Sequence, residues 1–275
     1  MLYFEELIKS VDNIPALSDL TFDIKEIYSY ENINVSKLIN VIESDVSLAA
    51  NILKMVNAPI YGFSRKISSL KQAVALFGTQ KIYGLVLNYS INQSIRANTR
   101  IFGLTNAEFN DMCHLQSSLL LQWYSTIDAD TAKFLAPLAL IMESGKLILA
   151  NEIMKNTLAK DYREKFNSCE DIQACENEFI GTTTYFLSGS LFEHWNLDSL
   201  YSDILKGLDF EEYLTPKIER YVHILDVVRV AINLKEILTE ESINYAADIV
   251  EELGFDDENF VSIALKVKED YENSK

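Results

Sequence analysis

Histidine is the side chain that most often binds a catalytic metal or moves a proton near neutral pH, and this chain has three. His114, His194 and His223 fall in three separate segments. His223 and Asp226 are three residues apart and could share one helix face, but two ligands are too few for a hydrolytic metal site. We expect a local hydrogen bond or a solvated pair there, and a packed or exposed ring for His194.

Other catalytic motifs are also missing from the sequence. Glu143-Ser-Gly-Lys146 is similar to the end of a phosphate-binding loop, but that motif needs glycine where Leu140 stands, after a strand. The sequence contains no G-x-S-x-G nucleophile elbow and no G-x-G-x-x-G dinucleotide motif. Cys113 and His114 are adjacent, and adjacent residues of a helix point about 100° apart, so they form no catalytic dyad.

The carboxylates and cysteines also show no spacing that is typical of a catalytic or metal-binding site. Glu176 with Glu178 is a pair that a helix surface carries by chance, and we expect both side chains to be solvated. The cysteines are odd in number and lack a C-x-x-C pair, which argues against a disulfide framework or a zinc ribbon. We therefore expect reduced, structural thiols at Cys113, Cys169 and Cys175.

The net charge of −17 limits the partners that the protein can bind. An extended basic face is what neutralises phosphates, and none is available here, so nucleic acid and anionic membranes are excluded as expected partners. The longest uninterrupted apolar run, residues 134–142, is well short of the roughly 20 residues of a membrane span. Glu5 and Glu6 stand where a secretory signal would be basic and then apolar, so we expect a cytoplasmic protein.

Apolar residues recur at helical spacing along the chain, and no Asn-Gly or Asp-Gly hairpin turn is present, which predicts an all-α fold. The clearest stripe is Leu70, Ala73, Val74 and Phe77. Gly78 directly after it predicts a positive φ angle and a tight turn, with a second helix continuing to about residue 94.

Further helices are predicted on both sides of this pair. Asp45 precedes an apolar stripe at residues 46–57 and is a candidate N-cap. Helices are also expected at residues 106–127 and 132–150, and Pro137 either kinks the latter or marks its true start.

The last forty residues hold 12 acidic and 3 basic side chains. They keep a helical period, with Thr239 as a candidate N-cap and Gly254 as a candidate C-cap. We interpret this segment as an acidic helical extension with a solvated face.

Three ordered motifs resemble the HDOD family, whose members are relatives of the HD and HD-GYP phosphohydrolases. They are Ile14-Pro-Ala-Leu17, the segment from Leu38 to Ala58, and Ile67-Ser-Ser-Leu-Lys-Gln-Ala-Val-Ala-Leu-Phe-Gly78. The resemblance implies a multi-helix HDOD-type, HD-like domain over residues 10–208, with residues 209–275 as a C-terminal extension packed on it. It also implies a role in bacterial signal transduction, usually without enzymatic activity.

The same resemblance locates the residues that HD enzymes use to bind metal. His114 matches the segment of the first histidine, whereas Met142 and Glu143 stand in place of the His-Asp doublet. A thioether is a poor ligand for a hard cation, so we predict no catalytic residues, no metal and no cofactor, with His114 and Glu143 as a vestigial site. Thr184 falls where the family places a later histidine.

The loop between the second and third of these motifs is a candidate contact surface. Pro59, Tyr61, Phe63 and Arg65 lie on an irregular loop, where exposed aromatic rings gain by being covered. Two interpretations remain open, because Tyr61 and Phe63 could equally plug the core of their own domain.

The sequence therefore predicts a non-catalytic bacterial regulatory protein that acts through protein–protein interaction. The alternative is a degenerate HD-type metal-dependent phosphohydrolase or a nucleotide-binding sensor. The partner, the input signal and the oligomeric state are not specified by the sequence.

Overall fold

A computed structural model of the chain describes residues 4–30, 32–58, 61, 65–209 and 214–273. Within these residues the regular structure is helical, and the only β-type pairing is one antiparallel bridge between Ile232 and Ile237. The predicted all-α fold is confirmed.

The helices, in chain order, are α1 (Phe4–Asp12), α2 (Asp19–Tyr28), α3 (Val35–Glu43), α4 (Val46–Val56), α5 (Leu70–Ser94), the 3-10 helix η2 (Thr99–Phe102), α6 (Asn106–Tyr124), α7 (Ala129–Ile141), α8 (Ser144–Lys155), α9 (Ala159–Ser168), α10 (Ile172–Ile180), α11 (Thr184–His194), α12 (Ser199–Gly207), α13 (Pro216–Ala231), α14 (Glu240–Glu252) and α15 (Asp257–Glu272).

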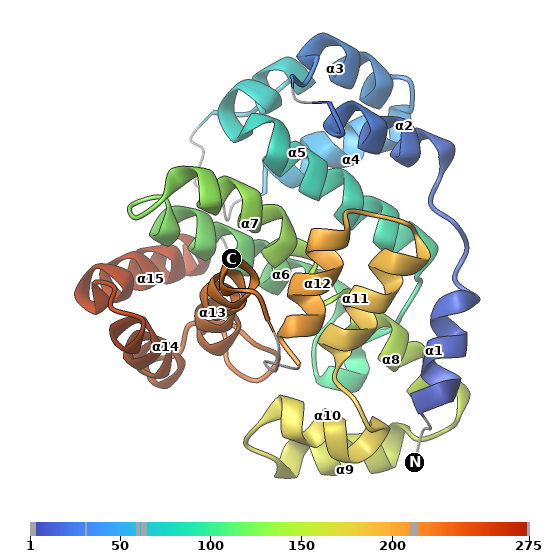
Figure 1. The fold of residues 1–275 in the computed structure, drawn as a ribbon, viewed down its shortest axis with the longest axis vertical. Helices are drawn as coiled ribbons and strands as arrows, with labels where there is room; N and C mark the ends of the chain where they lie inside the picture. The colour runs from blue at the N-terminus through green and yellow to red at the C-terminus, as the bar shows by residue number, and fades with distance from the viewer. Residues whose placement is uncertain (1–3, 31, 59–60, 62–64, 210–213, 274–275) are drawn as a thin grey trace.

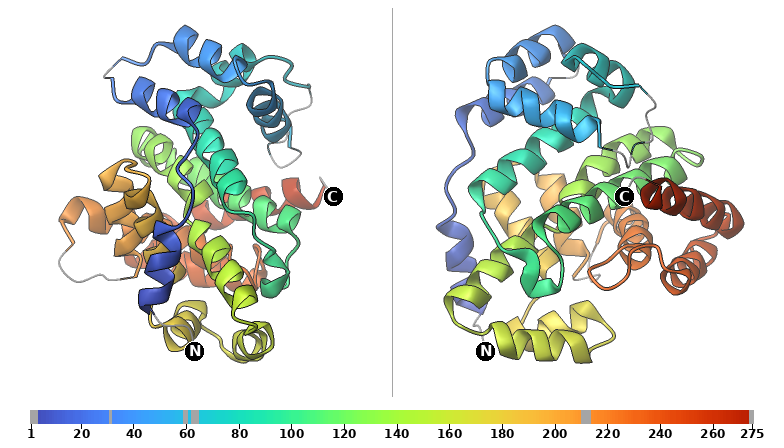
Figure 2. Two further views of the ribbon diagram at one scale, coloured as in Figure 1. Left: turned by 90° about the vertical axis from the view of Figure 1, so that its right-hand side faces the viewer. Right: turned by 180° about the vertical axis from the view of Figure 1, so that it is seen from behind.

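The long helix α5 runs from the end of the molecule that holds α2–α4 toward its centre (Figure 1). The short helices α2, α3 and α4 pack on α5, and so does α7. Helices α6, α7, α8 and α11 form the centre. Helices α9 and α10 lie at the end opposite to α2–α4, while α1 and the α14–α15 pair lie on opposite sides of the central helices (Figures 1 and 2).

Several helix boundaries follow the predicted capping chemistry. The Asp45 carboxylate accepts from the backbone amides at the start of α4, and the Thr239 hydroxyl does the same for α14. Gly254 has a φ of 77° just after α14. These caps satisfy amide and carbonyl groups that a helix end leaves unpaired.

Gly78 interrupts α5 with a φ of 74° and a ψ of 164°. The positive φ predicted from the sequence is confirmed. The ψ angle, however, lies outside the left-handed helical region, in extended backbone that essentially only glycine adopts. The turn between the two parts of α5 therefore restricts the residue type at position 78 more strongly than a simple helix C-cap would.

The helix predicted at residues 132–150 is two helices, because α7 ends at Ile141 and α8 begins at Ser144. The physical reason is Ser188 on α11. Its hydroxyl accepts from the Gly145 amide at 2.7 Å and donates to the Met142 carbonyl at 2.7 Å. These two bonds replace backbone pairs of a continuous helix, and Pro137 lies inside α7 and not at its start. The predicted helix 106–127 likewise ends earlier, at Tyr124.

The C-terminal helices pack on the centre through aromatic contacts. The Trp123 ring on α6 lies 5.2 Å from the Phe260 ring on α15 and 6.3 Å from the Phe255 ring. Helix α13 contacts α6, α7 and α12. Among the described residues, the C-terminal helices therefore pack directly on the preceding helices. The proposed domain boundary at residue 208 stays a prediction.

The central stretch Ala129–Lys155 is long and apolar enough to cross a membrane by length and composition, with a mean hydropathy of 1.4. A search for uninterrupted apolar residues alone was therefore too narrow a criterion for recognising a candidate membrane span. Because 89% of the apolar window is buried inside the fold, the stretch has the surroundings of a core helix, which passes the same test.

Candidate functional site

A buried lysine lies between two carboxylates where α8 meets α10 and α11. The Lys146 ammonium is 2.7 Å from the Glu143 carboxylate and 3.5 Å from that of Glu176. All three side chains are at most 3% exposed. Charges buried to this extent persist only when they are paired and hydrogen-bonded, so the three groups form one unit.

Neighbouring helices complete this unit with hydrogen bonds. The Lys146 ammonium donates to the Thr184 hydroxyl at 2.9 Å, and the Thr184 amide donates to Glu176 at 2.9 Å. Glu143 accepts from the Gln116 side chain at 2.9 Å and from the Tyr185 hydroxyl at 3.1 Å. The network thus ties α6, α8, α10 and α11 together.

The pKa shifts indicate which form, charged or neutral, is favoured for each group of the network. Burial acts to lower the pKa of Lys146, but the Glu143 and Glu176 carboxylates outweigh it and hold the pKa well above its usual value. Burial acts to raise the pKa of Glu143, yet Lys146 keeps it below the usual value. For Glu176, burial prevails and the pKa is raised. Lys146 and Glu143 therefore form a stable ion pair.

The residues at this place do not fit the metal of the HD enzymes. Met142 and Glu143 hold the doublet positions, and Thr184, at a matched histidine position, donates and accepts hydrogen bonds within the network. The Lys146 ammonium already supplies the positive charge between the carboxylates. In the described part of the chain, no three His, Cys, Asp or Glu side chains gather as a metal-binding group.

His114 belongs to a different cluster from Glu143. Its Nδ1 atom lies 2.7 Å from the Tyr61 hydroxyl, and its ring is buried. Lys81 is also buried; its ammonium donates to the Ser117 hydroxyl and lies 5.2 Å from the centre of the Tyr61 ring. Burial, and then the Lys81 charge, lower the pKa of His114 to about 3. Among the described residues no hydrogen bond or ion pair joins His114 to Glu143.

The predicted contact loop is described only in part. Tyr61 is half-buried, with its ring 4.9 Å from that of Phe77, and Arg65 is exposed. Pro59 and Phe63 lie outside the described residues. A contact role for this loop stays a prediction.

The sequence interpretation of Glu176 was wrong. Glu176 is 1% exposed and belongs to the network, whereas Glu178 is largely exposed and pairs with Lys165 on the surface. Lys146, Gln116 and Tyr185 were not predicted as network members at all. A usable signal was present, because Glu143 and Lys146 interrupt an otherwise apolar stretch that must be buried.

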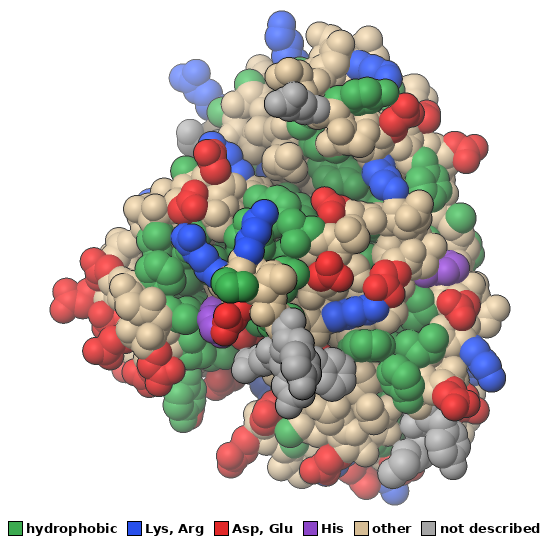
Figure 3. Space-filling view, in the orientation of Figure 1, with side chains coloured by type: hydrophobic (Ala, Val, Ile, Leu, Met, Phe, Trp, Pro, Cys, Tyr) green, Lys and Arg blue, Asp and Glu red, His purple; other side chains and the backbone are tan. Residues whose placement is uncertain are grey.

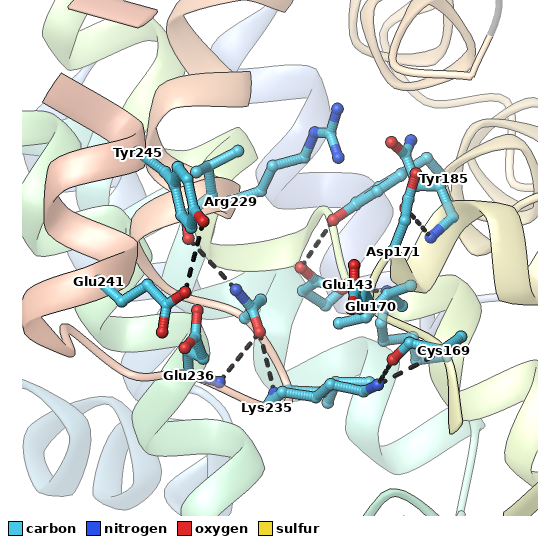
Figure 4. A pocket seen from close by; sticks show the side chains of 16 residues that line it. Glu143, Cys169, Glu170, Asp171, Tyr185, Arg229, Lys235, Glu236, Glu241 and Tyr245 are labelled. Carbon is cyan, nitrogen blue, oxygen red and sulfur yellow. Dashed lines mark hydrogen bonds and ion pairs between the residues drawn. The ribbon is translucent and has the colours of Figure 1, made fainter. Parts of the chain in front are cut away.

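A cavity of about 590 Å³ opens beside the network (Figure 4). Glu143 and Tyr185 form part of its wall, and Arg229 on α13, Lys235 in the connection between α13 and α14, and Glu241 on α14 line it as well. The cations of its wall already have partners: Lys146 in the network, Arg229 on Asp226 of α13, and Lys235 on the Cys169 carbonyl.

The two remaining histidines take no part in this site. His194 is exposed, with Nε2 2.9 Å from the Ile14 carbonyl oxygen. His223 is half-buried on α13, where Asp226 pairs with Arg229. The three cysteines are free thiols.

Solved structures of similar shape come from several bacteria. A virulence factor from Campylobacter jejuni is 25% identical, with a TM-score of 0.58 over 97% of this chain and 96% of the other. A "putative phosphohydrolase" from Shewanella amazonensis is 14% identical, with a TM-score of 0.73 over 94% and 93%. A "putative signal transduction protein" from Marinobacter aquaeolei is 16% identical, with a TM-score of 0.70 over 100% of this chain and 61% of the other.

No curated protein matches the chain. The model of the HDOD domain matches residues 14–206, which is most of the sequence and includes α2 to α11 and nearly all of α12. The match contains Glu143, Lys146 and Glu176, so the buried network lies inside the matched domain. This chain belongs to the HDOD family.

Proposed function

We propose that this protein is a non-catalytic regulatory protein that acts in the cytosol by binding protein partners. The observation that carries the proposal is the Lys146 ammonium between Glu143 and Glu176, at the place that resembles the metal centre of HD enzymes. An HD hydrolase needs a cation there with an open position for water.

Electrostatics explain why the lysine and a metal are mutually exclusive at this place. A divalent cation bound to Glu143 would lie within a few ångströms of an ammonium that is itself 3% exposed. Repulsion between like charges is strong where water does not screen it. A metal would therefore have to displace the Lys146 ammonium, which would break its contacts with Glu143, Glu176 and Thr184.

The charge of the surface supports a protein partner over nucleic acid or an anionic membrane. The chain carries 41 acidic and 24 basic residues. Acidic side chains gather over α14 and α15 in Figure 3. Such a surface repels phosphates and steers basic surfaces toward it.

A second candidate function, sensing of a small molecule, is favoured by the cavity of about 590 Å³, a size typical of ligand sites. Its lining argues against a nucleotide. Five carboxylates line the cavity together with three cations, each of which already has a partner. A ligand here would be cationic or neutral. The carboxylates are those of Glu143, Glu170, Asp171, Glu236 and Glu241.

Hydrolysis assays separate the regulatory proposal from a degenerate enzyme. The full chain is incubated with phosphodiester and nucleotide substrates in Mg²⁺, Mn²⁺ or Fe²⁺, beside the His114→Ala and Glu143→Gln variants. We expect no metal-dependent turnover that distinguishes the wild type from the variants. Turnover that both substitutions abolish would establish an enzyme.

Crosslinking in native cytosol, followed by mass spectrometry, tests the partner. We expect a discrete protein that is enriched over an equally acidic helical control protein. Arg65→Glu should reduce its capture several-fold if the predicted loop is the contact, and Arg96→Glu is the matched exposed control. No enrichment over the control protein would contradict the proposal.

A further inference from the structure

The stretch from residue 46 to residue 107 carries positive charges only. It contains seven lysine or arginine side chains and no aspartate or glutamate, although the whole chain has 41 acidic against 24 basic residues. Helix α4 and the start of α5 belong to this stretch and lie at the end of the molecule that holds α2–α4 (Figure 1). A strongly acidic protein thus has a local region of opposite charge.

Four of these cations are exposed where α4 ends and α5 begins. We call this group the basic corner; its members are Lys54, Arg65, Lys66 and Lys71. In the described part of the chain, the cations that form ion pairs belong to α7, α8, α9, α12 and α13 instead. No described carboxylate therefore neutralises the four charges, and they remain available to an anionic partner.

The side chain of Asn57 holds the two parts of the basic corner together. Its amide nitrogen donates to the Ile67 carbonyl at 2.8 Å, and its amide oxygen accepts from the Ile67 backbone amide at 2.8 Å. Lys54 stands about one turn before Asn57 on α4, and Lys66 is the neighbour of Ile67. The other two cations stand within four residues of Ile67. The four charges therefore gather around one fixed point of the backbone.

Lys71 stands in the first turn of α5, where a positive charge is unfavourable. The unpaired amides of a helix N-terminus carry a partial positive charge, which favours carboxylates and disfavours cations. This turn of α5 contains no acidic residue that would compensate. Stability alone would favour aspartate or glutamate at position 71. An anionic partner that covers the turn would convert the unfavourable interaction into a favourable one.

Exposed apolar area adjoins the basic corner. Gln72, Ala75 and Leu76 are three and four residues apart on α5, so they share one side of the helix, and all three are exposed. Leu76 is 57% exposed. Nucleic acid needs a more extended basic face than four side chains, and its phosphates are repelled by the net charge of −17. A protein segment with both carboxylates and an apolar side chain fits this surface better.

We propose that the basic corner and Leu76 bind an acidic segment of a partner protein. Carboxylates of the segment face the four cations, and an apolar side chain of the segment covers Leu76. The proposal rests on the proposed function, in which the chain acts by binding protein partners. The acidic helices α14 and α15 of a second copy are the competing occupant, so self-association is one outcome of the test.

Fluorescence anisotropy of labelled helical peptides, mixed with the full chain, tests the charge preference. One peptide is built from glutamate, alanine and leucine, and the control peptide has glutamine at every glutamate position. We expect the acidic peptide to bind about tenfold more tightly or better, with an affinity that falls as NaCl is added. Equal affinities, or tighter binding of a DNA duplex than of the acidic peptide, would overturn the proposal.

Charge reversal locates the binding surface. Lys66→Glu/Lys71→Glu should weaken binding of the acidic peptide by about tenfold. Lys160→Glu/Lys266→Glu changes the net charge equally at exposed positions of α9 and α15 and should bind within about twofold of the wild type. Glutamate is favoured in the first turn of α5, so the corner variant should unfold in urea no earlier than the wild type. Equal losses of binding in both variants would overturn the proposal.

Two further measurements separate this proposal from its alternatives. Light scattering should give the same molar mass for the wild type and for Lys66→Glu/Lys71→Glu; a lower mass of the variant would identify a second copy as the occupant and overturn the proposal. Crosslinking in native cytosol compares the same two proteins. A partner captured equally by both would overturn this proposal and keep the proposed function. No captured partner would contradict the proposed function, and the peptide affinities would still decide the charge preference of this surface.

Discussion

The Lys146 ammonium lies 2.7 Å from the Glu143 carboxylate, with both side chains at most 3% exposed. Lys133 and Asp130 have the same spacing in sequence and lie 3.3 Å apart, but their side chains are 62% and 97% exposed. Two pairs with one sequence pattern thus differ in their surroundings. Water screens the second pair and not the first.

Lys146→Met should destabilise the fold by about 3 to 5 kcal/mol, because it leaves Glu143 buried without its counter-ion. Lys133→Met is the matched control and should change stability by less than about 0.5 kcal/mol. Urea denaturation measures both. The double variant Glu143→Gln/Lys146→Met should lose less than the sum of the two single variants, and strict additivity would show that the two groups do not interact.

Gly78→Ala should cost about 1 to 3 kcal/mol, because its backbone angles belong to a region that alanine rarely adopts. A Cβ atom at Gly78 would have no heavy atom within 4 Å, so the whole effect comes from the backbone. A melting temperature equal to that of the wild type would contradict the positive φ.

Gly145→Ala should be more damaging than Gly78→Ala for a different reason. A Cβ atom there would lie 1.8 Å from the Thr184 carbonyl oxygen, where α8 crosses α11. Overlap with backbone is not relieved by a side-chain rotation. Circular dichroism and urea denaturation of both variants, compared side by side, check this order of stabilities.

Lys81 should make stability depend on pH. Burial lowers the pKa of Lys81 to about 7 in the folded protein, against an ordinary value of 10.5. Between these values the unfolded chain binds more protons, so stability rises as the pH increases from about 7 to 10.5, and below pH 7 this contribution no longer changes. Lys81→Met should remove this slope and stabilise the fold near pH 7 by at most about 4 kcal/mol.

Denaturation at several pH values compares Lys81→Met with Lys71→Met, an exposed control on the same helix. The control should keep the slope of the wild type. Equal slopes in all three proteins would show that the Lys81 ammonium is not desolvated.

Local patterns in the sequence were sufficient for the helices and many of their caps. Asp45 and Thr239 act on amides two or three residues away, so their roles can be read from the neighbouring sequence. The break between α7 and α8 depends on Ser188, more than forty residues later, and no local pattern contains it. The burial of Glu176 likewise depends on Lys146, which lies thirty residues earlier in the chain.

The matches of His114 and Glu143 to two segments of the family also did not predict the partners of these side chains. Motif positions fix where a residue stands on its helix, but the partner of a buried polar group depends on every helix that packs there. His114 therefore pairs with Tyr61, and Glu143 pairs with Lys146.

The central claim, that the Lys146 ammonium takes the place of a metal, is tested most directly by the metal content of the full chain purified without chelator and then incubated with Mn²⁺, Fe²⁺ or Zn²⁺. Elemental analysis after desalting should find far less than one equivalent of each metal, because a stoichiometric site needs at least three protein ligands and Lys146 already contacts both Glu143 and Glu176. One tightly bound equivalent that Glu143→Gln abolishes would contradict the account.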